Sequence, residues 1–123
     1  MGVRGEEQFT GKGVSYCSTC DAPLFRDAAV AVAGGGNSGV QAVLDLLANK
    51  ARQIYLVTNL EFTADQVLVE QIIDHPQVQI YLHSQVTAIH GEQTISSISV
   101  RNLENGNQEQ LPVEGIFIEI GLE

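Results

Sequence analysis

The sequence predicts an α/β fold with a Rossmann-like central parallel sheet flanked by helices, and with an inserted three-stranded antiparallel β-meander. An apolar run over residues 28–33 leads directly into a glycine turn and then into apolar residues at helical spacing. A second apolar run over residues 53–58 completes a strand–helix–strand unit, and its right-handed crossover makes the two strands parallel. Short alternating segments late in the chain predict the meander.

The first elements lie before and around the glycine turn. Residues 1–15, which are rich in Gly and Glu, predict a lead-in segment laid over a surface or crossing from another domain. We expect a short helix to begin near Cys17 and to continue toward Phe25, with Pro23 limiting its length. The first strand then covers about residues 28–33.

Two longer helices are expected, each with an apolar side. The first covers about residues 37–49, can be capped by Asn37 or Ser38, and has an inward face made of Val40, Val43, Leu44 and Leu47. The second runs from Ala64 to Asp74 and ends before Pro76. Its spaced residues along one side are Val67, Leu68, Gln71 and Ile72.

The remaining segments predict strands. Residues 78–82 add a third parallel strand, and residues 85–90, 95–102 and 109–113 form the meander. The dipeptide Asn105-Gly106 is a strong signal for a hairpin turn within it. A last buried strand follows over residues 115–121.

The chain is acidic and has an ordinary globular composition. Its 123 residues fit a single domain, residues 1–123, and are few for a complete two-cofactor enzyme, so we expect a piece of a larger protein. The net charge of −9 argues against nucleic-acid binding. No apolar run approaches the roughly 18–20 residues that span a bilayer, and the acidic start lacks the apolar region of a secretory signal. We therefore expect a cytoplasmic protein with no membrane partner.

The glycine turn predicts a phosphate-binding loop. Gly34, Gly36 and Gly39 have G-x-G-x-x-G spacing, in which the first permits the sharp turn, the second lets the backbone approach a phosphate, and the third lets the helix pack close to the strand. The helix that follows offers unpaired N–H groups to an anion. We therefore assign dinucleotide binding to the loop, which comprises Gly34, Gly35, Gly36, Asn37, Ser38 and Gly39.

The end of the second strand bears on the choice of nucleotide. An acidic residue there usually binds the ribose hydroxyls of NAD, and basic residues bind the extra phosphate of NADP. Val57, Thr58 and Asn59 occupy the position instead, and the nearest acid, Glu61, comes slightly late. Thr58 and Asn59 can hydrogen-bond a ribose, so this NAD(P)H site favours NADH slightly.

Cys17 and Cys20 form a C-x-x-C pair, the spacing that lets two thiols close a small disulfide. The alternatives are half of a zinc site or two plain buried thiols. A second C-x-x-C is absent from the sequence, and the histidines have no ligand spacing, so we predict a redox pair and no metal site. Asp21 follows the pair directly and can deliver a proton to a leaving thiolate, although a capping or solvated aspartate is equally compatible with its position.

Three motifs occur in order along the chain: residues 13–21, residues 34–39 and residues 115–121. Together they resemble the pyridine-nucleotide domain of the low-molecular-weight thioredoxin reductases, over essentially the whole chain. Residues 64–68 and the Asn-Ser-Gly form of the glycine turn are similar to the branch that contains the alkyl hydroperoxide reductase flavoprotein.

The resemblance implies a homodimeric FAD flavoprotein in which this domain is inserted between two halves of a flavin domain. Electrons would pass from a nicotinamide to FAD, then to the Cys17–Cys20 disulfide, and then to the disulfide of a thioredoxin-like protein. Cys20 would face the flavin, Cys17 would exchange with the partner disulfide, and Asp21 would supply the proton. The isolated domain would be inactive because hydride transfer needs the flavin.

One departure from the family pattern affects the choice of electron donor. Members that use NADPH carry His-Arg-Arg-x-x-x-Arg after the second strand, where this chain has Val57, Thr58, Asn59 and Thr63. The glutamate of the alkyl hydroperoxide branch near Val57 is absent from the sequence as well. Two interpretations stay open: an unusual NADH site, which the retained glycine turn favours, or a nucleotide-independent dithiol relay fed by another donor such as ferredoxin.

Overall fold

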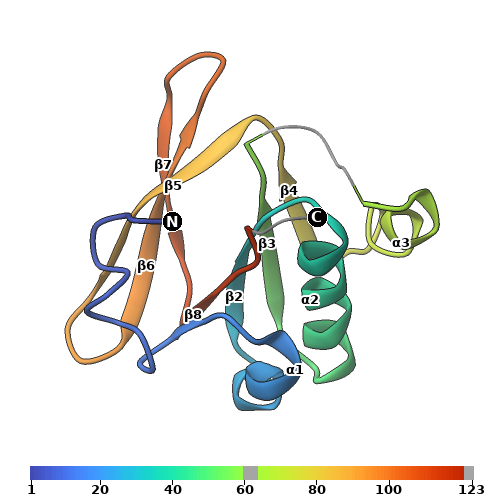
Figure 1. Cartoon of the computed structure of the whole chain (residues 1–123), viewed down its shortest axis with the longest axis horizontal. Coiled ribbons are helices and arrows are strands. Elements are labelled where there is room, and N and C mark those ends of the chain that lie inside the picture. Colours follow the sequence, from blue (N-terminus) through green and yellow to red (C-terminus); the bar gives the residue numbers. More distant parts are fainter. Residues whose placement is uncertain (60–63, 121–123) are drawn as a thin grey trace.

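A computed structural model describes residues 1–59 and 64–120 (Figure 1). The elements in chain order are β1 (Val14–Ser15), α1 (Ser18–Asp21), the 3-10 turn η1 (Ala22–Phe25), β2 (Ala29–Ala33), α2 (Asn37–Ala48), β3 (Gln53–Val57), α3 (Gln66–Glu70), β4 (Val78–Tyr81), β5 (Ser84–Gly91), β6 (Ile95–Asn102), β7 (Gln108–Pro112) and β8 (Gly115–Ile118). Within the described residues, no helix is long and apolar enough to span a membrane.

The central sheet has five parallel strands in the order β1-β8-β2-β3-β4. Strand β2 lies in the middle, where Ala31 is opposite Tyr55 of β3 on one side and Ile116 of β8 on the other. All five residues of β2 are buried, as a continuous apolar run in a parallel sheet predicts. The Rossmann-like parallel sheet expected from the sequence is confirmed.

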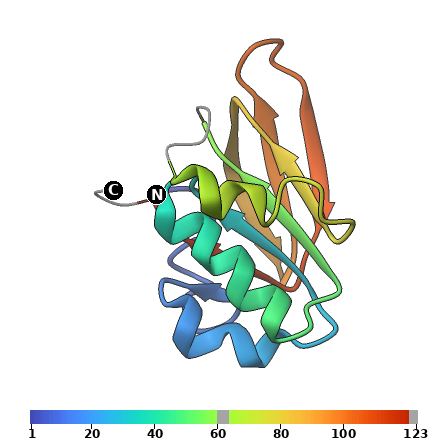
Figure 2. The ribbon, with the colours of Figure 1, turned by 90° about the vertical axis from the view of Figure 1, so that its right-hand side faces the viewer.

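A separate antiparallel sheet, in the order β5-β6-β7, covers one face of the central sheet, and the helices cover the other (Figures 1 and 2). Alternate residues of β2 face these two layers: Ala31 and Ala33 belong to the core beneath the meander, and Val30 and Val32 belong to the core beneath the helices. The inserted meander is confirmed. Its Asn105-Gly106 turn is present too, with Gly106 at φ +76°.

The lead-in segment contributes to the fold. Phe9 is only 2% exposed in the core beneath the meander, and the backbone of Arg4 bridges to Ala88 of β5. The strand β1, which the sequence pattern does not predict, adds parallel to β8 with Val14 opposite Ile116. This edge strand fixes the position of the chain just before the two cysteines.

The inward face of α2 is rotated from the predicted one. Val40 and Val43 are buried as expected, but Leu44 and Leu47 are only partly buried. The fully buried residue of the last turn is Leu46. Gly39 lies against the glycine turn, and residues three, four and seven positions after it therefore face the core.

The second predicted helix is shorter than expected. The α-helical part covers Gln66–Glu70, and the chain then continues in turns in which the N–H groups of Gln71 and Ile72 donate to carbonyls three residues earlier. Val69 and Ile72 are buried, whereas Val67 is 70% exposed and Gln71 is exposed. The last strand ends at Ile118, and the predicted Gly121 lies outside the described residues.

Candidate functional site

The glycine turn joins β2 to α2 at the carboxyl end of the parallel sheet. Gly34 has φ +132°, and a Cβ there would lie 2.6 Å from the carbonyl oxygen of Glu119. A Cβ on Gly39 would lie 2.0 Å from the carbonyl oxygen of Gly34. These positions require glycine, and the resulting close approach of α2 to the turn is the geometry that the motif predicts.

Thr58 and Asn59 follow β3 beside this turn but have different surroundings. Thr58 is 5% exposed, and a Cβ on Gly35 would lie 2.7 Å from its Oγ1 atom. Asn59 is exposed. Thr58 therefore packs beneath the turn, while the side chain of Asn59 is accessible to solvent. The other two residues compared with the family pattern, Glu61 and Thr63, lie outside the described residues.

The first turn of α2 is open to an anion. Its N-cap residue is Gly36, and no side chain caps the helix, so the predicted capping by Asn37 or Ser38 is wrong. Asn37 Oδ1 instead accepts a hydrogen bond of 2.8 Å from the backbone N–H of Asp65. The first N–H groups of a helix have no carbonyl partner within it, and together with the helix dipole they favour a negative group.

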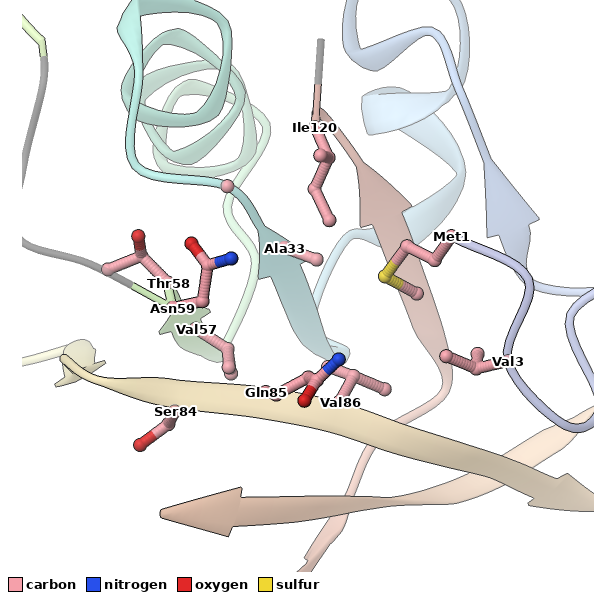
Figure 3. Close-up of a pocket in the computed structure, with 11 residues that line it drawn as sticks. Met1, Val3, Ala33, Val57, Thr58, Asn59, Ser84, Gln85, Val86 and Ile120 are labelled. Carbon is pink, nitrogen blue, oxygen red and sulfur yellow. The ribbon is translucent and has the colours of Figure 1, made fainter. Parts of the chain in front are cut away.

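A pocket of about 180 Å³ lies at the carboxyl ends of β2 and β3, between the central sheet and β5 (Figure 3). In open α/β sheets, ligands bind outside the carboxyl ends of the strands. Figure 3 shows the pocket between the glycine turn and the meander. Its walls are formed by Met1, Val3, Ala33, Gly34, Val57, Thr58, Asn59, Ser84, Gln85, Val86 and Ile120.

The two cysteines form a disulfide. Cys17 and Cys20 are bonded, with their Cα atoms 5.3 Å apart, at the start of α1. Cys20 is exposed and Cys17 is partly buried. The sequence-predicted pair is therefore close enough to bond, and one of its residues is open to an exchanging thiol.

The disulfide and the glycine turn share one hollow, of about 440 Å³. Cys17 and Thr19 line it from the dithiol segment, and Asn37, Ser38 and Gln41 line it from the beginning of α2. The Ser18 hydroxyl donates a 2.8 Å hydrogen bond to Asp45 Oδ2 and so joins α1 to α2. Two motifs that are more than ten residues apart in sequence are thereby brought to one surface.

Ser15, which the sequence pattern does not single out, lies beneath Asp21. Its Oγ atom is 2.6 Å from Asp21 Oδ2, 3.2 Å from the carbonyl oxygen of Cys17 and 3.1 Å from the backbone nitrogen of Cys17. Ser15 itself is 4% exposed. A serine two residues before a C-x-x-C-D motif gives no signal by itself, because the contact depends on the turn of α1.

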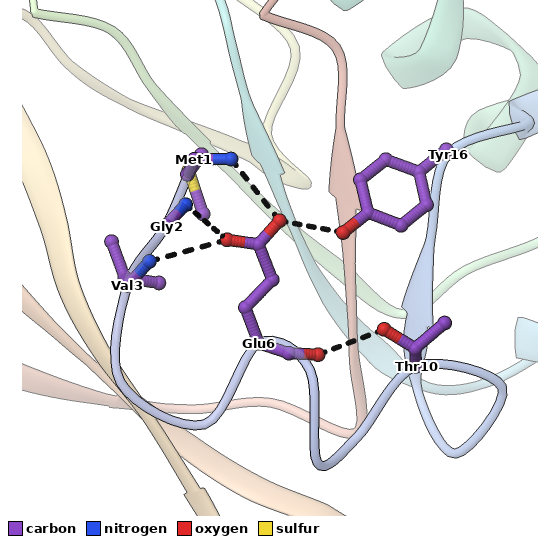
Figure 4. Close-up of polar contacts among 6 residues, drawn as sticks. All are labelled: Met1, Gly2, Val3, Glu6, Thr10 and Tyr16. Carbon is purple, nitrogen blue, oxygen red and sulfur yellow. Dashed lines mark hydrogen bonds and ion pairs between the residues drawn. The ribbon is translucent and has the colours of Figure 1, made fainter.

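A second polar cluster surrounds Glu6 in the lead-in segment (Figure 4). Its carboxylate accepts hydrogen bonds from Tyr16, from the terminal ammonium of Met1, and from the backbone of Gly2 and Val3. Burial by itself raises the pKa of Glu6, but these hydrogen bonds outweigh it and lower the pKa to about 2. The cluster fastens the residue before Cys17 to the lead-in segment.

The described residues contain no group of three or more His, Cys, Asp or Glu side chains that could hold a metal ion. His90 contacts Ser99 instead, with Nε2 2.7 Å from the hydroxyl oxygen. His75 accepts a hydrogen bond from the backbone of Gln77 through Nδ1.

Comparison with known families decides the membership. The model of the pyridine nucleotide-disulphide oxidoreductases matches residues 1–123. The chain belongs to this family. The resemblance to the thioredoxin reductase group of pyridine nucleotide-disulphide oxidoreductases, expected from the three ordered motifs, is confirmed.

Relatives and solved structures within the family agree on the fold. The chain is 42% identical over 127 residues to an alkyl hydroperoxide reductase of Escherichia coli, and 40% identical over 126 residues to a NADH dehydrogenase of Bacillus subtilis; both matches cover 99% of this chain and 24% of the relative. A thioredoxin reductase from Lactococcus lactis superposes with a TM-score of 0.94 at 27% identity, over 100% of this chain and 41% of that chain. The chain thus spans about a quarter of the length of these curated relatives.

Proposed function

We propose that this chain is the NAD(P)H-binding and dithiol domain of a thioredoxin-reductase-like flavoprotein, which transfers electrons from a nicotinamide via FAD to a protein disulfide. The observation that carries the proposal is the shared hollow, which the Cys17 side of the disulfide and the beginning of α2 line together. Family membership over the whole chain supports the same class of reaction. The nucleotide and FAD supply the two-electron redox chemistry, and the protein supplies binding and orientation.

The glycine turn fits the pyrophosphate of a dinucleotide. Side chains at Gly34 and Gly39 would collide with backbone atoms, and no side chain caps the first N–H groups of α2. We assign nucleotide binding to Gly34, Gly35, Gly36, Asn37, Ser38 and Gly39. Asn59, which is exposed at the end of β3, would hydrogen-bond a ribose, and Thr58 would support the turn from beneath.

The described residues that follow β3 give NADH a slight preference over NADPH. Val57, Thr58 and Asn59 carry no cation for a 2′-phosphate, and the protein has a net charge of −9. A 2′-phosphate at this position would therefore meet no opposite charge from these residues.

Within the dithiol segment, we propose that Cys17 exchanges with the partner disulfide, that Cys20 faces the flavin, and that Asp21 provides the proton for a leaving thiolate. All three residues lie on or beside α1, which the Ser18–Asp45 hydrogen bond joins to α2.

The whole protein would contain more than this domain. Met1 and Ile120, at the two ends of the described chain, line the same pocket, a geometry that suits insertion into a second domain (Figure 3). We propose a flavin domain in the parent chain, a homodimer, a thioredoxin-like disulfide protein as the partner, and a cytoplasmic location.

A second candidate is a dithiol relay that receives electrons without a nucleotide, from a donor such as ferredoxin. The observation that favours it is the uncharged sequence Val57-Thr58-Asn59 at the position where nucleotide-binding relatives carry charged residues. In this case the glycine turn would serve only to pack α2 against β2.

Thermal unfolding with each nucleotide separates the two candidates. NADH at about 100 times its dissociation constant would stabilise a binding domain by about 2.7 kcal/mol. Asn59→Ala should reduce this stabilisation, whereas Asn105→Ala, an exposed asparagine in the meander turn, should not. Absence of any shift with NADH or NADPH at millimolar concentration would reject the nucleotide-binding function and favour the relay.

A further inference from the structure

The hydroxyl of Ser15 occupies the centre of a small hydrogen-bond network between β1 and α1. The backbone N–H of Cys17 donates to Ser15 Oγ over 3.1 Å, and Ser15 Oγ donates to Asp21 Oδ2, which is 2.6 Å away. The carbonyl oxygen of Cys17 lies 3.2 Å from the same hydroxyl. Since Ser15 is 4% exposed, water competes little for these contacts.

This arrangement suits both protonation states of Asp21. A hydroxyl has one hydrogen to donate and two lone pairs that accept. When Asp21 is a carboxylate, Ser15 donates to it. When Asp21 is protonated, its O–H can donate to Ser15 Oγ, while the serine hydrogen turns toward the carbonyl oxygen of Cys17. The N–H of Cys17 keeps its acceptor throughout.

We propose that Ser15 is the positioning residue for Asp21, and that its hydroxyl holds the acid in one orientation before and after the proton has left. The inference rests on the proton-donating role proposed above for Asp21. It adds a residue outside the C-x-x-C-D motif to the dithiol machinery, and it gives the strand β1 a part in the reaction, because Ser15 is paired with Phe117 of β8.

The reaction that Ser15 assists is thiol–disulfide exchange. The Cys17 thiolate attacks one sulfur of a substrate disulfide, so a mixed disulfide forms and the substrate S–S bond breaks. The leaving sulfur takes the electron pair of that bond and receives the proton that Asp21 holds. The Cys20 thiolate then attacks Cys17 Sγ, closes the protein disulfide and releases the second substrate thiolate, which is protonated in turn. One dithiol and one disulfide give one disulfide and two thiols.

The experiment compares two probes on the full-length protein with its flavin domain. The dithiol is first reduced anaerobically with dithiothreitol, which is then removed, so the measurement needs no nucleotide. Hydroxyethyl disulfide releases a basic alkyl thiolate that needs a proton, whereas dithiobis(nitrobenzoic acid) releases an aromatic thiolate that leaves unaided. Ser15→Ala should slow the alkyl reaction about tenfold, because a hydrogen bond to a charged group is lost. It should leave the aromatic reaction within about twofold.

A double-mutant comparison tests whether Ser15 acts through Asp21. Asp21→Asn should slow the alkyl reaction, and adding Ser15→Ala to it should cause little further loss. Ser15→Thr, which keeps the hydroxyl, should restore most of the rate. Ser99→Ala removes a hydroxyl that contacts His90 in the meander, and it should change neither reaction.

Three results would overturn the proposal: equal slowing of both probes by Ser15→Ala, multiplication of the two single effects in the double variant, or no effect of Ser15→Ala while Asp21→Asn is slow. If Ser15→Ala does not fold by thermal unfolding, Ser15→Thr and Ser15→Val replace it, because they differ only in the hydroxyl group. If Asp21→Asn itself reacts normally with the alkyl probe, the proposed role of Asp21 fails, and the role of Ser15 fails with it.

Discussion

Replacing Gly39 with alanine tests whether α2 is pressed against the glycine turn. In the structure, an added Cβ would lie 2.0 Å from the carbonyl oxygen and 2.7 Å from the carbonyl carbon of Gly34. Ordinary van der Waals contact begins near 3.4 Å, so the helix and the turn would have to separate by more than an ångström. Because the opposing atoms belong to the backbone, no rotation of a side chain can relieve the clash.

Two effects compete in this variant. Inserting a methyl group into a packed region costs about 1–3 kcal/mol, whereas alanine in place of glycine favours a helix by about 1 kcal/mol. We expect the clash to win, with the free energy of unfolding reduced by about 1–2 kcal/mol. For a domain of this size the melting temperature would fall by about 3–10 °C.

Thermal unfolding followed by circular dichroism measures the effect. Gln41→Ala is the matched control: it lies on the same helix, it is exposed, and it adds helix propensity without a clash, so its stability should stay within about 0.5 kcal/mol of the parent. A melting temperature for Gly39→Ala that equals or exceeds that of the parent would refute the close approach of α2 to Gly34.

Three further results are expected. In the full-length protein, Cys17→Ser or Cys20→Ser should abolish turnover of a disulfide substrate while the thermal shift with NADH persists; surviving turnover would exclude the dithiol role. Leu46→Ala should reduce the unfolding free energy in urea by about 2–5 kcal/mol, because Leu46 is fully buried beneath α2, and a loss below about 1 kcal/mol would contradict that burial. The pKa of Glu6, about 2 in the fold against an ordinary 4.5, means that its carboxylate stabilises the fold above pH 4.5 and that this stability is lost as the pH falls toward 2. Glu6→Gln should remove about 1–3 kcal/mol of that acid sensitivity, as measured by urea unfolding between these pH values.

The sequence predicts the central part of the fold because its signals there are local. The run over residues 28–33 is buried on both faces, and the glycine turn follows it directly, so strand, turn and helix could each be placed within a residue or two. The Cys17–Cys20 pair is local as well, since a spacing of three residues at a helix start brings the two sulfurs within bonding reach.

The features that the sequence does not predict depend on contacts between distant residues. Two residues, Val14 and Ser15, are too few to show a strand pattern, and they become β1 only because β8 offers a partner. The rotation of α2 depends on the contact between Gly39 and Gly34 rather than on the count of apolar residues. The hydrogen bond between Ser15 and Asp21 exists only once α1 has turned.

The alternation of side-chain size along β2 has a consequence for protein engineering. The residues that face the meander are Ala31 and Ala33, and those that face the helices are Val30 and Val32. The layer on the alanine side can therefore approach more closely, and a larger residue at either alanine would lift the meander away from its support. A chimera that exchanges residues 84–112 with those of a relative must accordingly bring that relative's own β2 residues at these two positions, or its transplanted sheet will not seat.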